Sequence, residues 1–145
     1  MAPRPIFDLS KATLKTVTVA STKTSTYGYP QTFTLASDGS LLTEDSASGA
    51  AADAICVEGV AGTATTAGKQ CLVALLSGGG ILPVKVGTGG CTVSLWAKIV
   101  SDGAADSGTL GGGTTLVNVI GKFVQTGSAG DIVGMQPAPF AAVKA

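Results

Sequence analysis

One stretch near the end of the 145-residue chain predicts the fold: VIGKFVQTGSAGDIVGM, residues 119–135. Its two ends are rich in β-branched and aromatic residues, which favour extended strands. Its centre, Gln125 to Gly130, lacks bulky apolar side chains and contains glycines that reach positive φ. The stretch therefore predicts a β-hairpin. No catalytic motif accompanies it, so it favours a binding or structural role over an enzymatic one.

The same alternation of apolar runs and glycine-rich turns extends back to residue 55. The apolar runs cover residues 55–60, 71–76, 81–86, 92–100, 115–124 and 132–135, and the turns between them cover 61–68, 77–80, 87–90, 101–113 and 126–130. Short strands at this spacing predict an all-β fold, a compact barrel or sandwich. Pro83 within its run predicts an edge strand or a bulge.

The N-terminal third is less regular. Pro3 and Pro5 flank Arg4 and favour extended backbone, so residues 1–12 are expected to form an arm before a single β domain of residues 13–145. Ile6 and Phe7 are apolar anchors on this arm, or they pack on their own domain. Further strands are expected over 13–19 and 31–36. Residues 41–54 are rich in alanine and predict either a helix or a loop.

Composition points to a protein whose surface meets another protein. The chain is 45% hydrophobic and only 12% charged, and its net charge is zero. Little long-range repulsion therefore opposes association. Residues 1–30 carry four basic side chains against Asp8, and residues 31–60 carry five acidic side chains and no basic one. Neither block is dense enough to predict nucleic-acid binding, which needs a clustered basic face.

The cysteines predict neither a metal site nor a disulfide framework. Cys56, Cys71 and Cys91 are far apart and odd in number, and the chain has no histidine. They are expected to be buried thiols of a protein made in a reducing compartment. The apolar stretch 71–84 is broken by Pro83 and three glycines, and the first residues lack the pattern of a signal peptide, so no membrane association is expected.

Catalysis and cofactor binding are not expected. Without histidine the serines lack their usual general base. The acidic pairs Glu44-Asp45 and Asp102/Asp106 lie in loops rich in small residues, where turn hydrogen bonds explain them. The glycines at 87–90 are followed by Cys91, not by the Lys-Ser/Thr and helix of a phosphate-binding loop. The sequence therefore predicts no enzyme, cofactor or metal.

Threonines alternate in the N-terminal third, at 16/18, 22/24/26 and 32/34. Alternate residues share one face of a strand, and a flat threonine array suits ice or carbohydrate. The spacing does not recur at a constant period, so ordinary solvent-facing threonines are the simpler interpretation.

Four segments follow one another in an order that suggests a family: ILPVKV at 81–86, AKIVSDG at 97–103, VIGKF at 119–123 and AGDIV at 129–133. This order resembles the small capsid cement, or head decoration, proteins of tailed bacteriophages. The resemblance covers residues 55–140, with Lys122 and Phe123 where the family usually has a small residue. Residues 1–50 match no family pattern.

The resemblance implies a compact, tulip-like β domain that is made in the host cytoplasm and sits on the outer capsid. Such proteins bridge neighbouring major capsid proteins, commonly as homotrimers; a dimer remains an alternative. We expect Arg4, Ile6 and Phe7 to contact the shell, with Trp96 as a second contact or as a core residue. The functional alternatives are a head-fibre base or other minor virion adaptor, and a carbohydrate- or ice-binding β domain.

Overall fold

The computed structural model describes residues 4, 6–18, 26–27, 32–35, 37–38, 41–44, 49, 51–58, 63–64, 70–101 and 104–143. Within these residues the chain is all-β and has no helix, which confirms the predicted fold class. The strands are β1 (Leu14–Thr18), β2 (Thr26–Tyr27), β3 (Thr32–Leu35), β4 (Leu41–Glu44), β5 (Ala54–Glu58), β6 (Thr63–Ala64), β7 (Gln70–Leu75), β8 (Leu82–Lys85), β9 (Trp96–Ser101), β10 (Ala104–Gly108), β11 (Leu116–Phe123) and β12 (Ile132–Val143).

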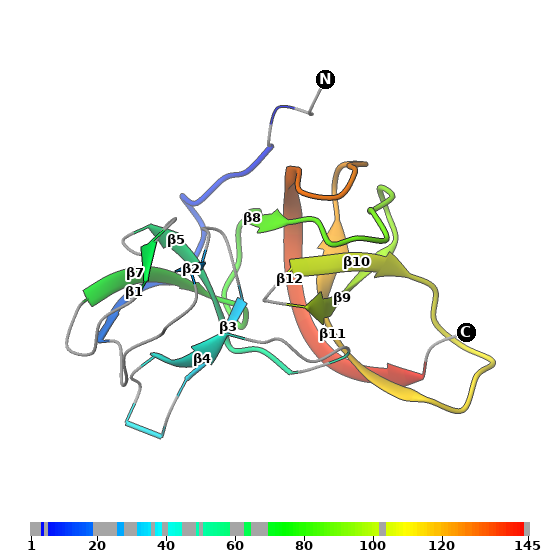
Figure 1. Ribbon diagram of the computed structural model, residues 1–145, viewed down its shortest axis with the longest axis horizontal. Helices are drawn as coiled ribbons and strands as arrows, with labels where there is room; N and C mark the ends of the chain where they lie inside the picture. The colour runs from blue at the N-terminus through cyan, green and yellow to red at the C-terminus, as the bar shows by residue number, and fades with distance from the viewer. Residues whose placement is uncertain are drawn as a thin grey trace.

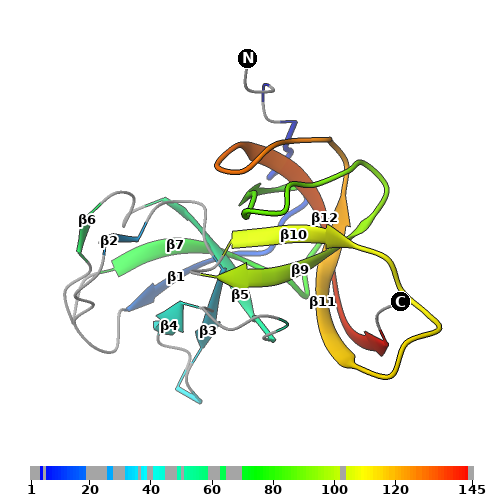
Figure 2. The same ribbon diagram turned by 45° about the vertical axis from the view of Figure 1, so that its right-hand side comes forward.

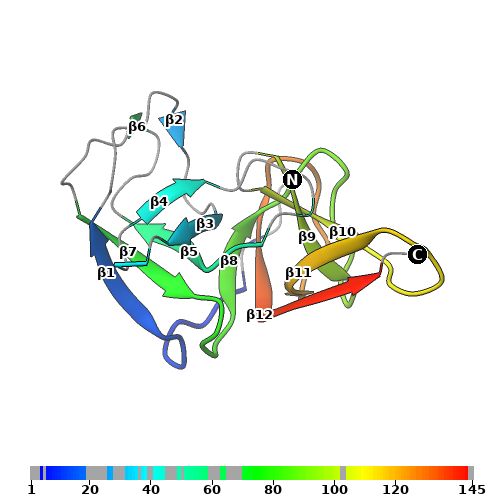
Figure 3. The same ribbon diagram turned by 90° about the horizontal axis from the view of Figure 1, so that it is seen from below.

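The strands form two five-stranded antiparallel sheets and one small two-stranded sheet. The first sheet has the order β1-β7-β5-β3-β4, the second β10-β9-β11-β12-β8, and β2 pairs with β6. Figure 1 shows the first sheet on the left and the second on the right, with β8 lying between them, and Figure 3 shows the same arrangement from below. Chain order follows this division, because strands β1 to β7 precede the second sheet entirely.

The second sheet is strongly curved but is not a closed barrel. Its long strands β11 and β12 bend together in Figures 1 and 2. The residue after edge strand β8 approaches edge strand β10 at a parallel bridge between Val86 and Ala105, where the Gly87 amide donates to the Ala105 carbonyl at 2.9 Å. The architecture is therefore a two-sheet sandwich.

The main core is one cluster to which both sheets contribute, and the second-sheet part of the chain supplies most of it. Ile55, Ala74 and Leu76 from the first sheet side belong to it together with Phe123 and Met135 from the second, and all five are at most 1% exposed. The opposite face of the first sheet carries a second, smaller cluster: Val17, Ala54, Cys56, Cys71 and Val73. Strands β5 and β7 of the first sheet are thus apolar on both faces.

The predicted hairpin over residues 119–135 is confirmed. Phe123 pairs with Met135 and Lys122 with Gln136, and Gly130 in the connection has φ +86°. Strand β12 is longer than predicted and continues to Val143 through two prolines. Proline is tolerated there because β8 pairs only with Ile132–Met135, which leaves one side of the later residues without a ladder partner among the described strands.

The segments 41–54 and 101–113 differ from the sequence-based expectations. The segment 41–54 contains strand β4 and the first residue of β5, not a helix, because Ala54 pairs with Phe33 on one side and Leu75 on the other. Sheet pairing overrides the helix propensity of alanine here. Strand β10 lies inside the predicted turn 101–113, since pairing with β9 stabilises a run of small residues that lacks β-branched side chains. The prediction that Pro83 marks an edge strand is confirmed for β8.

Candidate interaction surface

The backbone of the N-terminal arm is held by one side chain, Gln125. Its amide nitrogen donates to the Arg4 carbonyl at 2.7 Å, and its amide oxygen accepts from the Ile6 amide at 2.6 Å. The same oxygen accepts from the Gly134 amide of β12 at 2.9 Å. Gln125 therefore joins the arm to the hairpin connection and to β12 at once.

A second attachment lies just after the arm. Asp8 and Ile81 form an antiparallel bridge with two 2.9 Å backbone hydrogen bonds. Leu9 and Ala12 then pack against the main core. Residues 8–12 are thus built into the domain, and the arm residues that lie over its surface are Arg4, Ile6 and Phe7.

The turn after the bridge is fixed by the Asp8 carboxylate. Its Oδ1 atom accepts from the Ser10 hydroxyl at 2.6 Å and from the Ser10 amide at 2.9 Å. These two hydrogen bonds, the hydroxyl one above all, lower the pKa of Asp8 from its ordinary value of 3.8.

The arm presents its apolar side chains outward. Ile6 is 57% exposed and Phe7 is 44% exposed. Both side chains therefore remain largely exposed, although the Ile6 amide is hydrogen-bonded to the domain. The sequence left open whether Ile6 and Phe7 pack on their own domain, and in the structure much of each side chain does not.

Trp96 lies outside the core, on the outer face of the second sheet. It faces Lys122 across β9 and β11, and the Lys122 ammonium lies 5.7 Å from the ring centroid, within cation–π range. Phe140 of β12 meets the indole edge-on, with centroids 5.0 Å apart and planes at 89°. Such a T-shaped pair is favourable beyond its buried area and holds the indole in place.

The arm and Trp96 lie over the same face of the second sheet. Val133 and Met135 are in the core, so Gly134 and Gln136 between and beyond them face outward. Gly134 underlies Ile6, and Gln136 pairs with Lys122, the partner of Trp96. Ile6 and Trp96 thus lie on one face of the second sheet, which we call the outer face. Gln125 holds the Arg4 backbone beside Ile6, and Phe7 follows Ile6 in the chain.

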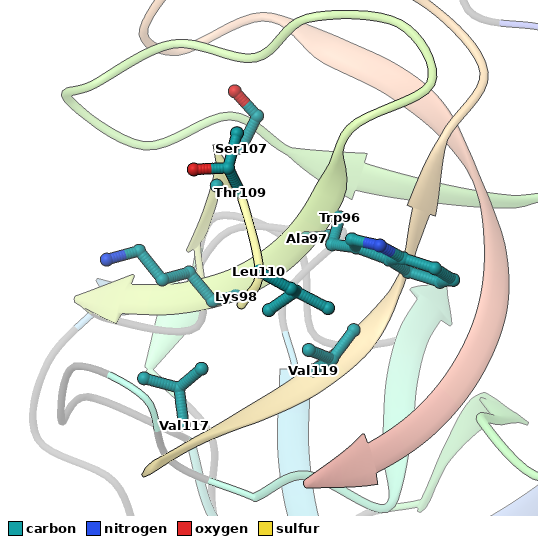
Figure 4. A pocket seen from close by; sticks show the side chains of 9 residues that line it. Trp96, Ala97, Lys98, Ser107, Thr109, Leu110, Val117 and Val119 are labelled. Atoms are coloured by element: carbon teal, nitrogen blue, oxygen red, sulfur yellow. The ribbon is translucent and has the colours of Figure 1, made fainter. Parts of the chain in front are cut away.

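A cavity of about 180 Å³ opens on this face beside Trp96. Figure 4 shows Trp96 and Lys98 projecting on either side of Leu110, with Val117 and Val119 below. The lining residues are Trp96, Ala97, Lys98, Ser107, Gly108, Thr109, Leu110, Val117 and Val119. The hollow is therefore mainly apolar, with one cation and two hydroxyl groups at its border.

Asp106 is the acidic candidate whose side chain the structure describes, and its role is structural. Asp106 is 9% exposed, and its Oδ2 atom accepts from the Gly89 amide at 2.8 Å, which fixes the turn after β8. Its Oδ1 atom is buried without a hydrogen-bond partner in the described part of the chain. Asp45 and Asp102 lie outside the described residues, as does Gly103.

Threonines of the N-terminal third do not share one exposed face. Thr16 and Thr18 are exposed on β1, whereas Thr32 on β3 is fully buried. Thr22 and Thr24 lie outside the described residues. This distribution gives the ice- or carbohydrate-binding alternative no flat array to use within the described strands.

All three cysteines are buried thiols, as predicted. Among the residues described, no three histidine, cysteine or acidic side chains gather as metal ligands would. No helix of that same part has the length and apolar character needed to cross a membrane.

Sequence reasoning missed Gln125, Lys122 and Phe140. Gln125 lies between the predicted strand and the predicted turn, where no local pattern marks a residue that binds a segment about 120 positions away. Phe140 is the one with a usable signal, since a single aromatic residue between prolines and alanines near the end of a strand suggests an exposed contact. No family model, curated protein or solved structure matches the chain.

Proposed function

We propose that this chain is a structural virion protein that binds the outside of an assembled capsid and clamps neighbouring major capsid proteins. The observation that carries the proposal is the arm, in which Ile6 and Phe7 are 57% and 44% exposed on a backbone held by Gln125. The resemblance of residues 55–140 to cement proteins supplies the partner.

An arm whose backbone is already fixed on the domain binds a partner more favourably than a free segment does. Ordering a free segment on association costs conformational entropy, and part of that cost is removed when the segment is already hydrogen-bonded in place. Burying the exposed parts of Ile6 and Phe7 against a partner then contributes on the order of 1–2 kcal/mol each. The arm therefore suits contact with a preformed surface such as a capsid shell.

Trp96 and its neighbours supply a second contact. Tryptophan is enriched among residues that dominate interface energetics. Lys98 and Lys122 flank it, so an acidic surface on the major capsid protein would complement this side of the outer face. Repeated weak contacts become strong attachment on a lattice, and self-association as a homotrimer, or as a dimer, increases the number of contacts per particle.

A pelleting assay tests the proposal. DNA-emptied heads of the phage that encodes the chain are mixed with labelled protein, with a variant lacking residues 1–7, and with Phe7→Ser. Leu14→Ser is the matched control, because Leu14 on β1 is 43% exposed, as Phe7 is 44%, but lies in the first sheet.

The proposal predicts that wild type and Leu14→Ser co-sediment with the heads, whereas the truncated chain and Phe7→Ser bind at least about tenfold more weakly. No binding of wild type to the heads would refute the cement function. Binding at only a few copies per head would favour the minor adaptor instead.

A further inference from the structure

Two of the three cysteines lie on adjacent strands and face the same way. Cys56 on β5 pairs with Val73 on β7, and Cys71 precedes Val73 by two residues, which puts both sulfur atoms on one face of the first sheet. Both side chains belong to the small cluster on that face and are 0% and 3% exposed. A side-chain hydrogen bond from Cys56 is the largest influence on the pKa of Cys71.

The two thiols differ in acidity and therefore in reactivity. The hydrogen bond from Cys56 lowers the pKa of Cys71, although burial opposes this shift. The thiolate is the reactive form of cysteine, so Cys71 is the better nucleophile of the two.

We propose that Cys56 and Cys71 form a disulfide site that a peroxide closes. The Cys71 thiolate attacks the peroxide oxygen and becomes a sulfenic acid, with release of water once a proton is taken up. The Cys56 sulfur then attacks the Cys71 sulfur, its thiol proton leaves with the hydroxyl as a second water, and the S–S bond forms. Two thiols are oxidised and one peroxide is reduced to two waters. This inference does not depend on the proposed function.

The strand geometry permits the step. Diagonal neighbours across an antiparallel pair lie farther apart than direct partners, so bond formation needs a small backbone shift. A register shift between Cys56 and Glu58 interrupts the regular ladder beside the first sulfur, so the backbone there is not held in an ideal register. Cys71 pairs on its other side with Val17 of β1, an edge strand, and local opening of that edge admits a small oxidant.

Cys91 provides an internal control. It lies in the main core with the second sheet, and its thiol donates to the Gln125 carbonyl at 3.4 Å. Burial raises the pKa of Cys91, which disfavours its thiolate. It is therefore expected to remain a thiol under conditions that oxidise the pair.

The test uses the full chain in its native state. Reduced protein is treated with hydrogen peroxide, then denatured and labelled with N-ethylmaleimide, and the number of labels and the cross-linked peptides are measured by mass spectrometry. Cys56→Ser, with Cys56→Ala as a second form, removes one member of the pair, and Cys91→Ser removes only the control thiol.

Oxidised wild type should lose two hydrogen atoms, take one label instead of three and yield a peptide that links Cys56 to Cys71. Cys91→Ser should form the same link, and neither Cys56 variant should form an intramolecular link. Three labels after treatment, a link through Cys91, or sulfinic acid at Cys71 without a link would each overturn the proposal.

Discussion

The carbonyl oxygen of Ile6 occupies the space that a Cβ atom would need at Gly134. Gly134 is not in the positive-φ region, so glycine is required there by close approach of the arm and not by backbone conformation. Because Gly134 carries a hydrogen atom where every other residue carries Cβ, the arm can lie against the outer face.

Gly134→Ala is expected to displace the arm while strand β12 stays paired. The added methyl group would meet the Ile6 carbonyl and, at 2.8 Å, a methyl group of Val124. Amide hydrogen exchange at Ile6 should accelerate by about fivefold to thirtyfold, because the loss of roughly 1–2 kcal/mol of hydrogen bonding shifts the docking equilibrium by that factor. Unchanged protection at Ile6 would show that the arm tolerates the methyl group. Gly108→Ala is the control, since a Cβ there meets only ordinary contacts with Lys98, 3.9 Å away.

Gln125→Ala is expected to release the same arm by a different route. It removes the acceptor of the Ile6 and Gly134 amides and the donor to Arg4, so protection should fall at Ile6. Gln125→Glu keeps both acceptor functions but loses the donor, and should lie between wild type and Gln125→Ala. The free energy of unfolding, measured in urea, should fall by about 1–2 kcal/mol for the alanine variant. Equal exchange in all three proteins would contradict the role given to Gln125.

Asp106→Ala should destabilise the fold more than Asp106→Asn. The alanine variant removes the charged acceptor of the Gly89 amide, and a hydrogen bond to a charged group contributes about 1.5–3 kcal/mol. Asparagine retains one oxygen to accept from Gly89 and places its amide where Oδ1 now has no partner in the described structure. Urea unfolding of the two variants measures the difference, and a more stable alanine variant would contradict this account.

The stability of the turn at Asp8 should depend on pH in the acid range. The pKa of Asp8 is lowered in the folded chain, so its ionised form stabilises the turn above the ordinary value of 3.8, and this contribution is lost as pH falls through the lower folded pKa. Ser10→Ala removes the hydroxyl donor and should raise the pKa of Asp8, whereas Ser10→Thr keeps a hydroxyl and should not. An NMR titration of the Asp8 carboxyl carbon measures each value; identical titration of wild type and Ser10→Ala would argue against the hydrogen bond.

Much of the fold was predictable because strands rich in β-branched residues alternate with glycine turns. The hairpin over 119–135 and the edge strand at Pro83 follow from local residue preferences, which act within a few positions of the chain. Strand β10 did not follow, since Ala104 to Gly108 become a strand only through pairing with β9.

The contact surface was predictable only in part. The prolines around Arg4 indicate an extended segment with apolar residues after it. Nothing local assigns Gln125 to hold that segment, because the hydrogen bonds join residues 119 and 121 positions apart. Likewise, the contact between Cys56 and Cys71 depends on the register of β5 and β7, which spacing in the sequence does not reveal.

The most direct test of the cement function is cryo-electron microscopy of particles assembled with this chain. The proposal predicts density for the two-sheet chain on the outside of the shell at many equivalent lattice positions, with Arg4 to Phe7 and Trp96 against the major capsid protein. Density confined to a single vertex or the tail, the outer face turned to solvent, or particles that lack the chain altogether would contradict it.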